Sequence, residues 1–297
     1  MRIIHYSGCP VCGSPDCKPV FSVKDHTVSK ELFPVWECNA CTARFTQDVP
    51  DAASIGPYYQ AEGYISHTDT SKGLVNRLYQ LVRKKTLRKK RKLIERLTGI
   101  KRGQLLDVGS GTGAFANEMK QYGWNVTGLE PDEGAKDVAR RSYNIELKNI
   151  DEFYKLPGNS FDAITLWHVL EHVHELSSYV DQLKRLLKDK GKLFIAVPNY
   201  TSKDAAIYQA HWAAYDVPRH LYHFSPRSMQ LLMEKHGLKT EKHIPMWYDS
   251  FYISMLSSKY RNGKTNLVAS FFNGLRSNLK AMSDARRCSS VIYMIRK

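Results

Sequence analysis

Three glycines at alternate positions, from Gly109 to Gly113, follow directly on a short apolar run that contains Asp107. Glycine at such positions lets the backbone turn sharply and approach a flat ligand closely, because no Cβ intervenes. The next apolar run ends in Glu130, 21 residues beyond Gly109, where a carboxylate can accept hydrogen bonds from both hydroxyls of a ribose. The spacing predicts a site that binds a nucleoside.

The identity of that nucleoside depends on the strand end. Gly109-x-Gly111-x-x-Ala114 also fits the fingerprint of dinucleotide-binding proteins, which alone is a weak signal. Asp107 counts against a dinucleotide, because that fingerprint usually keeps the strand end apolar. An acid just before the glycines suits a ligand that has a cationic amino acid end and no phosphate. A nicotinamide enzyme remains the main alternative.

Four of the six cysteines form two pairs, Cys9-x-x-Cys12 and Cys38-x-x-Cys41. In a cytoplasmic chain such pairs favour metal binding over disulfides, with a redox pair as the alternative. The two turns resemble a zinc ribbon, in which each turn gives two thiolates to a tetrahedral zinc. Four thiolates leave no open position, so we expect a structural zinc, and metal binding would supply much of the folding free energy of so small a unit.

Residues 168–172 have the pattern His-x-x-Glu-His, which also occurs in zinc proteases. That motif requires a continuous helix with both histidines on one face, whereas the preceding residues 163–167 form a buried strand. We therefore interpret His168 and His172 as candidate general bases, because histidine suits proton removal near neutral pH. The other candidates for this role are His211, His220 and His223.

Alternating strands and helices must position these groups. Strands are predicted at Gln104–Val108, Asn125–Leu129, Ile145–Lys148, Asp162–Trp167, Lys192–Val197, Lys239–Ile244 and Ser290–Arg296, and helices at residues 73–98, 114–122, 132–142, 176–187 and 226–236. This alternation predicts an α/β fold with a doubly wound, mainly parallel sheet. Ligands of such sheets bind beyond the carboxyl ends of the strands, which is where the glycine loop, Glu130, Asp151 and Trp167-His168 fall.

Here the sequence resembles the class I S-adenosylmethionine-dependent methyltransferases. Asp107-x-Gly-x-Gly-x-Gly is similar to their first motif, and residues 161–173 are similar to their fourth strand and the turn after it. Residues 100–245 look most like the ubiquinone-biosynthesis type of O-methyltransferase. The resemblance implies a Rossmann-like sheet of seven strands, closed by an antiparallel strand, with S-adenosylmethionine as the cofactor.

The resemblance also implies roles for individual residues. The methionine end of the cofactor would be held by Asp107, Gly109, Ser110, Gly111, Thr112 and Gly113, and the ribose by Glu130. Asp151 would meet the adenine, and Trp167 would pack beside the cofactor. Tyr59 and Tyr64 would belong to an aromatic segment that folds over the cofactor.

Composition bounds the partners and the location. The chain has 297 residues, is 42% hydrophobic and carries a net charge of +15. Eight of the ten residues 83–92 are Lys or Arg, which predicts a solvated helix face or contact with an anionic membrane surface or RNA. No apolar run is long enough to span a bilayer, and the first residues do not resemble a signal peptide, so we expect a cytoplasmic protein.

Three modules are predicted. Residues 1–50 form a zinc-ribbon-like unit, residues 51–98 form a connector with a basic helix, and residues 99–297 form a methyltransferase domain with insertions at about 200–224 and 246–287. Apolar patches in the second insertion could cover the pocket, pair subunits or enter a membrane surface. We predict a methyltransferase that uses S-adenosylmethionine and acts on a small molecule, most readily at oxygen. The alternatives are an RNA methyltransferase and a non-catalytic cofactor-binding protein.

Overall fold

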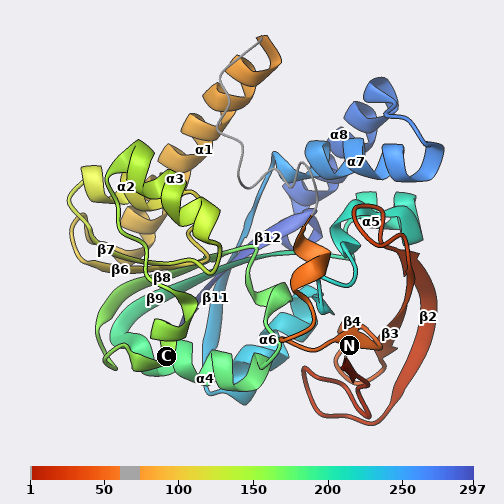
Figure 1. Ribbon diagram of the computed structural model, residues 1–297, viewed down its shortest axis with the longest axis horizontal. Coiled ribbons are helices and arrows are strands. Elements are labelled where there is room, and N and C mark those ends of the chain that lie inside the picture. The colour runs from red at the N-terminus through yellow and green to blue at the C-terminus, as the bar shows by residue number, and fades with distance from the viewer. Residues whose placement is uncertain (1, 61–73) are drawn as a thin grey trace. The chain divides into compact units, whose positions relative to one another are not determined.

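The computed structural model describes residues 2–60 and 74–297, with the side chains of 83 onward in the first long helix (Figure 1). The predicted contribution of Tyr64 lies outside the described residues. Contacts divide the chain into two compact units: unit 1 contains residues 1–61, 168–181 and 195–295, and unit 2 contains residues 62–167, 182–194 and 296–297. Each is described below by itself. The sequence modules predicted above remain a prediction.

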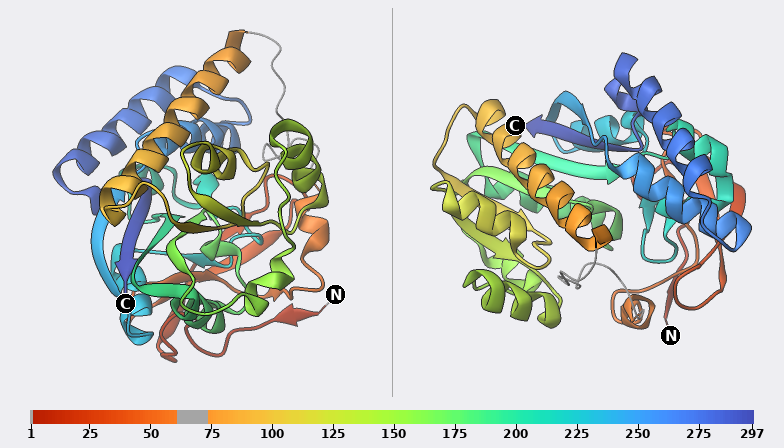
Figure 2. Two further views of the ribbon diagram at one scale, coloured as in Figure 1. Left: turned by 90° about the vertical axis from the view of Figure 1, so that its left-hand side faces the viewer. Right: turned by 90° about the horizontal axis from the view of Figure 1, so that it is seen from above.

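The main sheet has six strands in the order β11-β12-β9-β8-β6-β7. Their bounds are β6 Gln104–Val108, β7 Asn125–Leu129, β8 Phe161–Trp167, β9 Leu187–Pro198, β11 Lys239–Pro245 and β12 Ser290–Arg296. Strand β6 pairs in parallel with both β7 and β8. The final strand β12 lies between β9 and β11, so the chain returns to the sheet at its last strand (Figures 1 and 2). The mainly parallel α/β sheet is confirmed.

The prediction of seven strands is wrong for the described residues. The stretch Ile145–Lys148 forms only one parallel bridge, between Lys148 and Leu129. Ile145 and Leu147 instead place their side chains in a small core with Ala116 and Ala139. The chain then turns into the 3₁₀ helix η3 (Ile150–Lys155), which leaves no room for a longer ladder.

Unit 2 surrounds the amino-terminal strands of this sheet with helices α1 (Leu74–Thr98), α2 (Ala114–Gln121) and α3 (Glu133–Tyr143). Helix α2 packs on β7 and α1 packs on α2. Leu105, Leu106 and Val108 of β6 are fully buried, as a central strand of a two-sided sheet requires. Helix α3 begins where the Asp132 side chain accepts a hydrogen bond from the backbone N–H of Ala135.

Unit 1 contains the amino-terminal cysteine turns, and its small sheet has the strand order β10-β4-β3-β2. Strands β2 (Cys17–Lys24), β3 (Leu32–Cys38) and β4 (Arg44–Thr46) are consecutive, whereas β10 (Tyr222–His223) comes from the segment predicted as an insertion. Tyr222 pairs with Phe45 across that edge. The ribbon sheet is thus completed by residues about 177 positions later in the chain.

The remaining elements of unit 1 are short strands β1 (Ile3–Ile4) and β5 (Val49–Pro50), helices α4 (Leu176–Leu186), α5 (Lys203–Tyr208), α6 (Pro226–Lys235), α7 (Asp249–Asn262) and α8 (Leu267–Ser283), and 3₁₀ turns η1 (Gly56–Tyr59), η4 (Leu170–His172), η5 (Gln209–His211), η6 (Ala213–Tyr215) and η7 (Ala285–Arg287); α4 ends in unit 2. Trp212 and Tyr215 belong to a hydrophobic core that residues of the ribbon and of 205–217 share. Within the described residues, no helix combines the length and apolarity that crossing a membrane needs.

Candidate functional site

The glycine loop of unit 2 joins β6 to α2 through three backbone positions with positive φ. Gly111 has a φ of 53°, and a Cβ there would meet nothing within 4 Å, so its backbone faces open space. Gly113 has a φ of 75° and would place a Cβ 2.8 Å from that of Ala139. The amides of Gly109 and Ser110 both donate to the carbonyl oxygen of Leu129, at 2.9 Å each. The loop is therefore held against the end of β7 while its centre stays accessible to a ligand.

Asp107 is fully buried at the end of β6. Its Oδ1 accepts a hydrogen bond of 2.6 Å from the hydroxyl of Thr165, whereas its Oδ2 has no hydrogen-bond partner among the described residues. Burial raises the pKa of Asp107 to about 6, although Thr165 and the nearby ammonium of Lys90 oppose that rise. A buried carboxylate oxygen that lacks a donor fits a ligand with a cationic ammonium group.

Glu130 is oriented by the glycine loop itself. Its Oε2 accepts from the amide of Gly111 at 2.7 Å, and its Oε1 accepts from the amide of Asp132 at 3.1 Å. The side chain is almost completely buried. These bonds fix the carboxylate at the end of β7, beside the loop, which is where the sequence predicts contact with a ribose.

Two basic residues of α1 contact the glycine loop region, and sequence reasoning missed this. Arg83 Nη2 donates to the hydroxyl of Thr112 at 2.9 Å, and the ammonium of Lys90 lies 4.0 Å from the ring centre of Trp167. A third cation, Arg91, binds Glu118 and Glu95. The basic run is thus divided between an inner face toward the loop and an outer hollow of about 460 Å³, lined by Lys84, Lys85, Arg88, Lys89 and Lys92. The positions of the eight cations around a helix could have shown from the sequence that some of them face away from the others.

The other predicted cofactor residues of unit 2 differ in their surroundings. Trp167 ends β8, packs edge-on against Phe115 at 5.4 Å and has a buried Nε1 without a partner in the described part of the chain. Asp151 is exposed in the first turn of η3. The carboxylate of Asp151 is therefore free of the tight packing that fixes Asp107 and Glu130.

The histidines of residues 168–172 lie in unit 1 and do not share a continuous helix. His168 stands alone after β8 with a φ of 59°, in the left-handed region that bulky residues seldom adopt, and only residues 170–172 form a 3₁₀ turn. This geometry excludes a zinc-protease motif. His168 Nε2 lies 3.1 Å from Asp249 Oδ2, and Nδ1 lies 3.3 Å from Glu171 Oε1. Burial alone would lower the pKa of His168, but the two carboxylates outweigh burial and raise it to about 9.

His172 has the opposite electrostatics. Burial and the neighbouring imidazole of His220, whose ring centre lies 4.6 Å away, lower the pKa of His172 to about 4. Its Nδ1 lies 3.0 Å from the backbone carbonyl oxygen of Arg219, which can only accept a hydrogen bond. Nδ1 therefore carries the proton and Nε2 carries the lone pair. The hydroxyl of Tyr59 lies 3.1 Å from the same Nδ1, so the described contact of Tyr59 is with His172.

Glu171 completes this cluster, although its carboxylate was not predicted as a site residue. Its side chain is fully buried, and neither carboxylate oxygen accepts a well-oriented hydrogen bond from the described residues. Burial raises the pKa of Glu171, but His168, His220 and His172 outweigh burial and lower it. The ligand atoms of Glu171, His172 and His220 lie within 4.8 Å of one another. The cluster thus joins a buried anion to two imidazoles.

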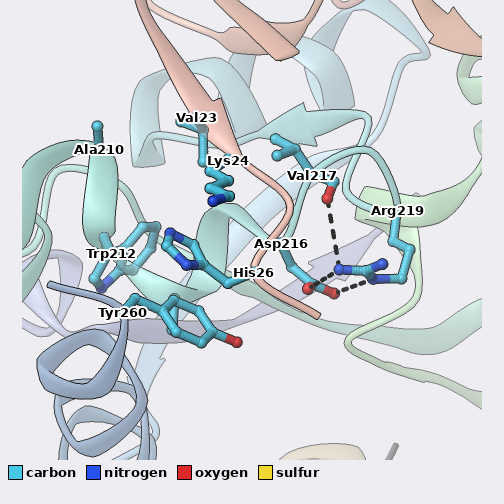
Figure 3. Close-up of a pocket in the computed structure, with 10 residues that line it drawn as sticks. Val23, Lys24, His26, Ala210, Trp212, Asp216, Val217, Arg219 and Tyr260 are labelled. Atoms are coloured by element: carbon cyan, nitrogen blue, oxygen red, sulfur yellow. Dashed lines mark hydrogen bonds and ion pairs between the residues drawn. The ribbon is translucent and has the colours of Figure 1, made fainter. Parts of the chain in front are cut away.

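The buried Arg219 links the histidine cluster to the ribbon through its hydrogen bonds. Its guanidinium donates to Asp25 at 3.0 Å, to Asp216 at 2.7 Å and to the carbonyl oxygen of Tyr58 at 2.8 Å. Figure 3 shows its pairing with Asp216 beside a cavity of about 10 Å³, which is large enough for one water. Because the backbone carbonyl of Arg219 accepts the hydrogen bond from His172 Nδ1–H, the Arg219 side chain links the ribbon residue Asp25 to the histidine.

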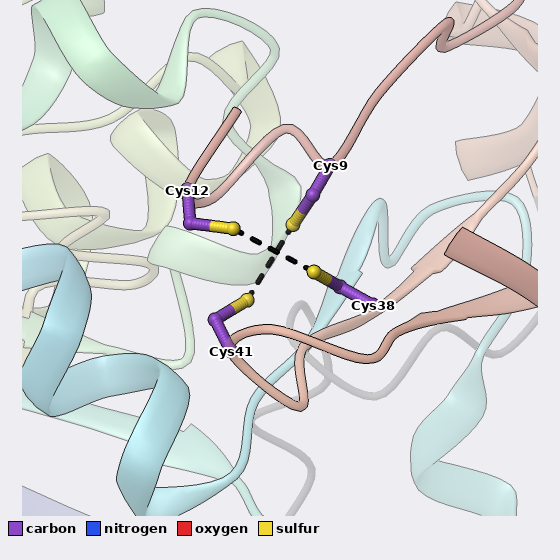
Figure 4. Close-up of side chains that lie close together, drawn as sticks. All are labelled: Cys9, Cys12, Cys38 and Cys41. Carbon is purple, nitrogen blue, oxygen red and sulfur yellow. Dashed lines mark hydrogen bonds between the residues drawn. The ribbon is translucent and has the colours of Figure 1, made fainter. Parts of the chain in front are cut away.

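The four paired cysteines converge on one point in unit 1 (Figure 4). Cys9 Sγ lies 3.5 Å from Cys41 Sγ, and Cys12 Sγ lies 3.6 Å from Cys38 Sγ. These distances are too long for disulfides and close to the roughly 3.8 Å edge of a tetrahedron with zinc–sulfur bonds of about 2.3 Å. The donor set therefore fits a structural zinc ion.

Thr42 occupies the second cysteine turn where ribbons often have glycine. Its φ is 61°, against 85° for Gly13 in the first turn. The Thr42 hydroxyl lies 2.7 Å from that of Ser225, and its carbonyl accepts a 2.6 Å bond from the Tyr200 hydroxyl. These contacts hold a non-glycine residue in an unfavourable backbone conformation.

Comparison with known proteins agrees with this arrangement. Residues 81–243, more than half of the chain, match the family model described as "Methyltransferase domain". The ubiquinone biosynthesis O-methyltransferase of Thiobacillus denitrificans is 29% identical over 159 residues, which cover 49% of this chain and 68% of that protein. The enzyme of the same name from Nitrosococcus oceani is 30% identical over 174 residues, which cover 54% of this chain and 72% of the relative.

A solved structure supports the fold. The magnesium protoporphyrin IX methyltransferase of Synechocystis PCC 6803, with bound SAH, matches with a TM-score of 0.50 and 14% identity, covering 78% of this chain and 91% of that one. At this identity the similarity concerns the fold alone. The residues matched by the family model include the glycine loop and the strands on either side of it.

Proposed function

Because the chain belongs to the methyltransferase domain family and uses S-adenosylmethionine as its methyl donor, we propose that it methylates a hydroxyl group of a small-molecule acceptor, with His172 as the general base. The proposal rests chiefly on the lone pair of His172 Nε2, which is fixed by the Nδ1 contact with the Arg219 carbonyl. The names of the ubiquinone O-methyltransferase relatives are consistent with an oxygen acceptor.

The residues of unit 2 fit the cofactor, and each has a separate task in the proposal. The buried Oδ2 of Asp107 would accept a hydrogen bond from the ammonium of the methionine end, and Glu130 would bind the ribose hydroxyls. Arg83 and Lys90 lie next to Thr112 and Trp167 and would neutralise the cofactor carboxylate. Ser110 and Thr112, both buried in the loop, remain predicted contacts of the methionine end, as Tyr59 remains a predicted cofactor contact, and Asp151 would reach the adenine. When bound, S-adenosylmethionine supplies an activated methyl group.

The histidine cluster would then remove the acceptor proton. The Nε2 atom of His172 takes the hydrogen of the acceptor O–H, so that the oxygen lone pair is available for methyl transfer. The carboxylate of Glu171 stabilises the resulting imidazolium. His168, with its pKa near 9, stays protonated at neutral pH and balances the charges of Glu171 and Asp249. His168 would therefore position the cluster, and His172 would perform the proton transfer.

We expect the variant Asp107→Asn to bind S-adenosylhomocysteine at least tenfold more weakly than the unmodified protein in calorimetric titrations. Loss of one charged hydrogen bond, about 1.5 to 3 kcal/mol, predicts this change. The free energy of unfolding should remain equal or rise, because Asp107→Asn removes a buried carboxylate that lacks a donor. The matched control is Asp137→Asn, an exposed carboxylate paired with Arg140. Equal affinity of Asp107→Asn, or preference of the protein for NAD, contradicts the proposed cofactor site.

We also propose that Cys9, Cys12, Cys38 and Cys41 hold a structural zinc ion. Elemental analysis of the purified protein should find about one zinc per chain. The Cys9→Ser variant should lose zinc and melt at a lower temperature in scanning calorimetry, because structural zinc adds its binding free energy to folding. Cys17→Ser, in the same ribbon but outside the cluster, should retain both zinc and stability. A folded protein without zinc, or an equal loss in both variants, contradicts the assignment.

The outer cations of α1 support a weaker proposal of contact with an anionic partner. Residues 84–92 include five cations that line the outer hollow of this helix. An RNA partner would bind with an affinity that falls steeply as salt is added. RNA-binding titrations between about 50 and 200 mM salt separate that alternative from a face that only keeps the helix solvated.

A further inference from the structure

In the hairpin of α7 and α8 in unit 1, helix α8 buries polar and small residues and exposes large apolar ones. The buried face of α8 consists of small and polar residues: Ser270, Gly274, Ser277, Asn278 and Ala281. Its outer face is apolar and between 54% and 73% exposed at Leu267, Val268, Phe271, Phe272, Leu279 and Met282. A helix on a water-soluble surface normally has the opposite distribution. The outer apolar residues of α8 are called the apolar face below.

The apolar face forms one stripe along α8, and the buried Asn278 lies near one edge of it. At about 100° per residue, its six residues and the half-buried Leu275 fall within an arc of about 140°. Arg276 and Lys280, both exposed, follow on one side of that arc. An apolar stripe with a basic border is the pattern of helices that lie in the interface of a bilayer.

Polar contacts on the inner side fix the rotation of α8. Ser277 Oγ donates to the buried Asp204 at 2.6 Å, and the Asn278 side chain donates from Nδ2 to the carbonyl oxygen of Trp247 at 2.8 Å. A Cβ at Gly274 would lie 2.8 Å from the ring of Phe251, so the two helices approach closely. Turning the apolar face inward would break these bonds and bury large side chains where only small ones fit. The exposure of the apolar face is therefore part of the fold.

The charges around the hairpin select an anionic partner. Residues 246–287 contain seven Lys or Arg and two Asp. The two acids are already paired, Asp249 with His168 and Asp284 with Arg286. A second copy of this chain would bring the same positive charge against itself, whereas an anionic lipid surface would complement it. Trp247, Tyr248 and Tyr252 are partly exposed and add aromatic rings of the kind enriched at membrane interfaces.

We propose that the apolar face of α8 docks this protein onto the surface of an anionic phospholipid bilayer. Helix α8 has 17 residues and is about 25 Å long, so it would lie in the plane of the interface with Phe271 and Phe272 among the acyl chains. Arg276 and Lys280 would extend toward the lipid headgroups. The proposal does not depend on the acceptor or on the catalytic base.

Sedimentation of the whole protein with vesicles tests this proposal. We expect binding to vesicles of phosphatidylcholine and phosphatidylglycerol, and much weaker binding to phosphatidylcholine alone. Val268→Glu/Phe272→Glu should lose at least nine-tenths of the bound fraction, and Arg276→Gln/Lys280→Gln should weaken binding roughly fivefold for each charge removed. Both pairs are exposed, so the fold should persist and calorimetry should show unchanged melting.

The matched control is Ile3→Glu/Leu32→Glu, which changes two equally exposed apolar residues on β1 and β3. This control should bind vesicles as the unmodified protein does. Equal binding of Val268→Glu/Phe272→Glu and the control overturns the proposal, as does the absence of vesicle binding at any lipid composition. A dimer in solution that Val268→Glu/Phe272→Glu dissociates, without vesicle binding, would show that a second copy covers the apolar face and would also overturn it.

Discussion

Replacing His172 with alanine should lower kcat by about 10²- to 10⁴-fold while leaving the affinity for S-adenosylhomocysteine unchanged. The reason is that His172 supplies the lone pair that removes the acceptor proton, whereas the cofactor contacts belong to other residues. Steady-state kinetics beside calorimetry measures the two effects separately. His211→Ala is the matched control, since His211 is exposed in the same unit and was an alternative base; its kcat should stay within about twofold.

The pH profile of kcat tests the same assignment independently. With a His172 pKa near 4, the base is unprotonated above about pH 5, so the rate should be flat well below the ordinary histidine midpoint of about 6.5. The raised pKa of His168, about 9, predicts a fall in rate as pH rises through 9, because protonated His168 holds Glu171 and Asp249 in place. With S-adenosylmethionine saturating, so that Asp107 stays ionised beside the bound ammonium, an acid limb near pH 6.5 would contradict His172 as the base. Turnover that requires an added divalent cation at Glu171, His172 and His220 would also contradict it.

Replacing Arg219 with methionine should lower the free energy of unfolding by about 3 to 5 kcal/mol, because Asp25 would be left as a buried charge and Asp216 as a partly buried charge without their cation. Denaturant titration measures the change. Arg140→Met is the matched control: Arg140 also pairs with two carboxylates, Asp137 and Glu146, but all three are more than half exposed. That control should leave the free energy of unfolding nearly unchanged, because solvent screens these exposed pairs.

A variant without the three charges separates the effect of Arg219 on stability from its effect on the orientation of His172. Arg219→Met/Asp25→Asn/Asp216→Asn removes the cation and both anions, so much of the lost stability should return. Its kcat should nevertheless be lower than that of the unmodified protein, because the backbone carbonyl that orients His172 loses the anchor to Tyr58 and the ribbon. Full recovery of both stability and kcat would contradict a positioning role for Arg219.

The sequence predicts local features of the fold and site well. The glycine loop and Glu130 lie within one strand–turn–helix–strand unit, so spacing alone determines their proximity. The cysteine pairs are also predicted by local spacing, because a CxxC turn places two sulfur atoms together. Two such turns are typical of a zinc site. The prediction of a strand at residues 145–148 was wrong. Ile145 and Leu147 alternate as in a strand, but the same two side chains can pack against helix residues without a strand ladder.

Long-range partners could not be predicted. The Asp25–Arg219 ion pair joins residues 194 positions apart, and the Asp249 carboxylate meets His168 across 81 positions. No periodicity relates such residues, and each is a common surface type by itself. The sequence predicts His211, His220 and His223 as alternative bases, but telling a buried support from a catalytic group requires their hydrogen bonds.

The pairing of β10 with β4 also affects how the chain folds during synthesis. The ribbon strands emerge from the ribosome first, yet Tyr222 and His223 must be made before the edge of β4 is covered. At roughly 5 to 20 residues per second, the intervening 177 residues take on the order of 10 to 35 s. Throughout that time a nascent strand edge is available for wrong pairing with other chains. Early capture of zinc would keep the ribbon compact in this interval, so we expect growth in zinc-poor medium to reduce the yield of soluble protein during expression more than it reduces the stability of protein that has already folded.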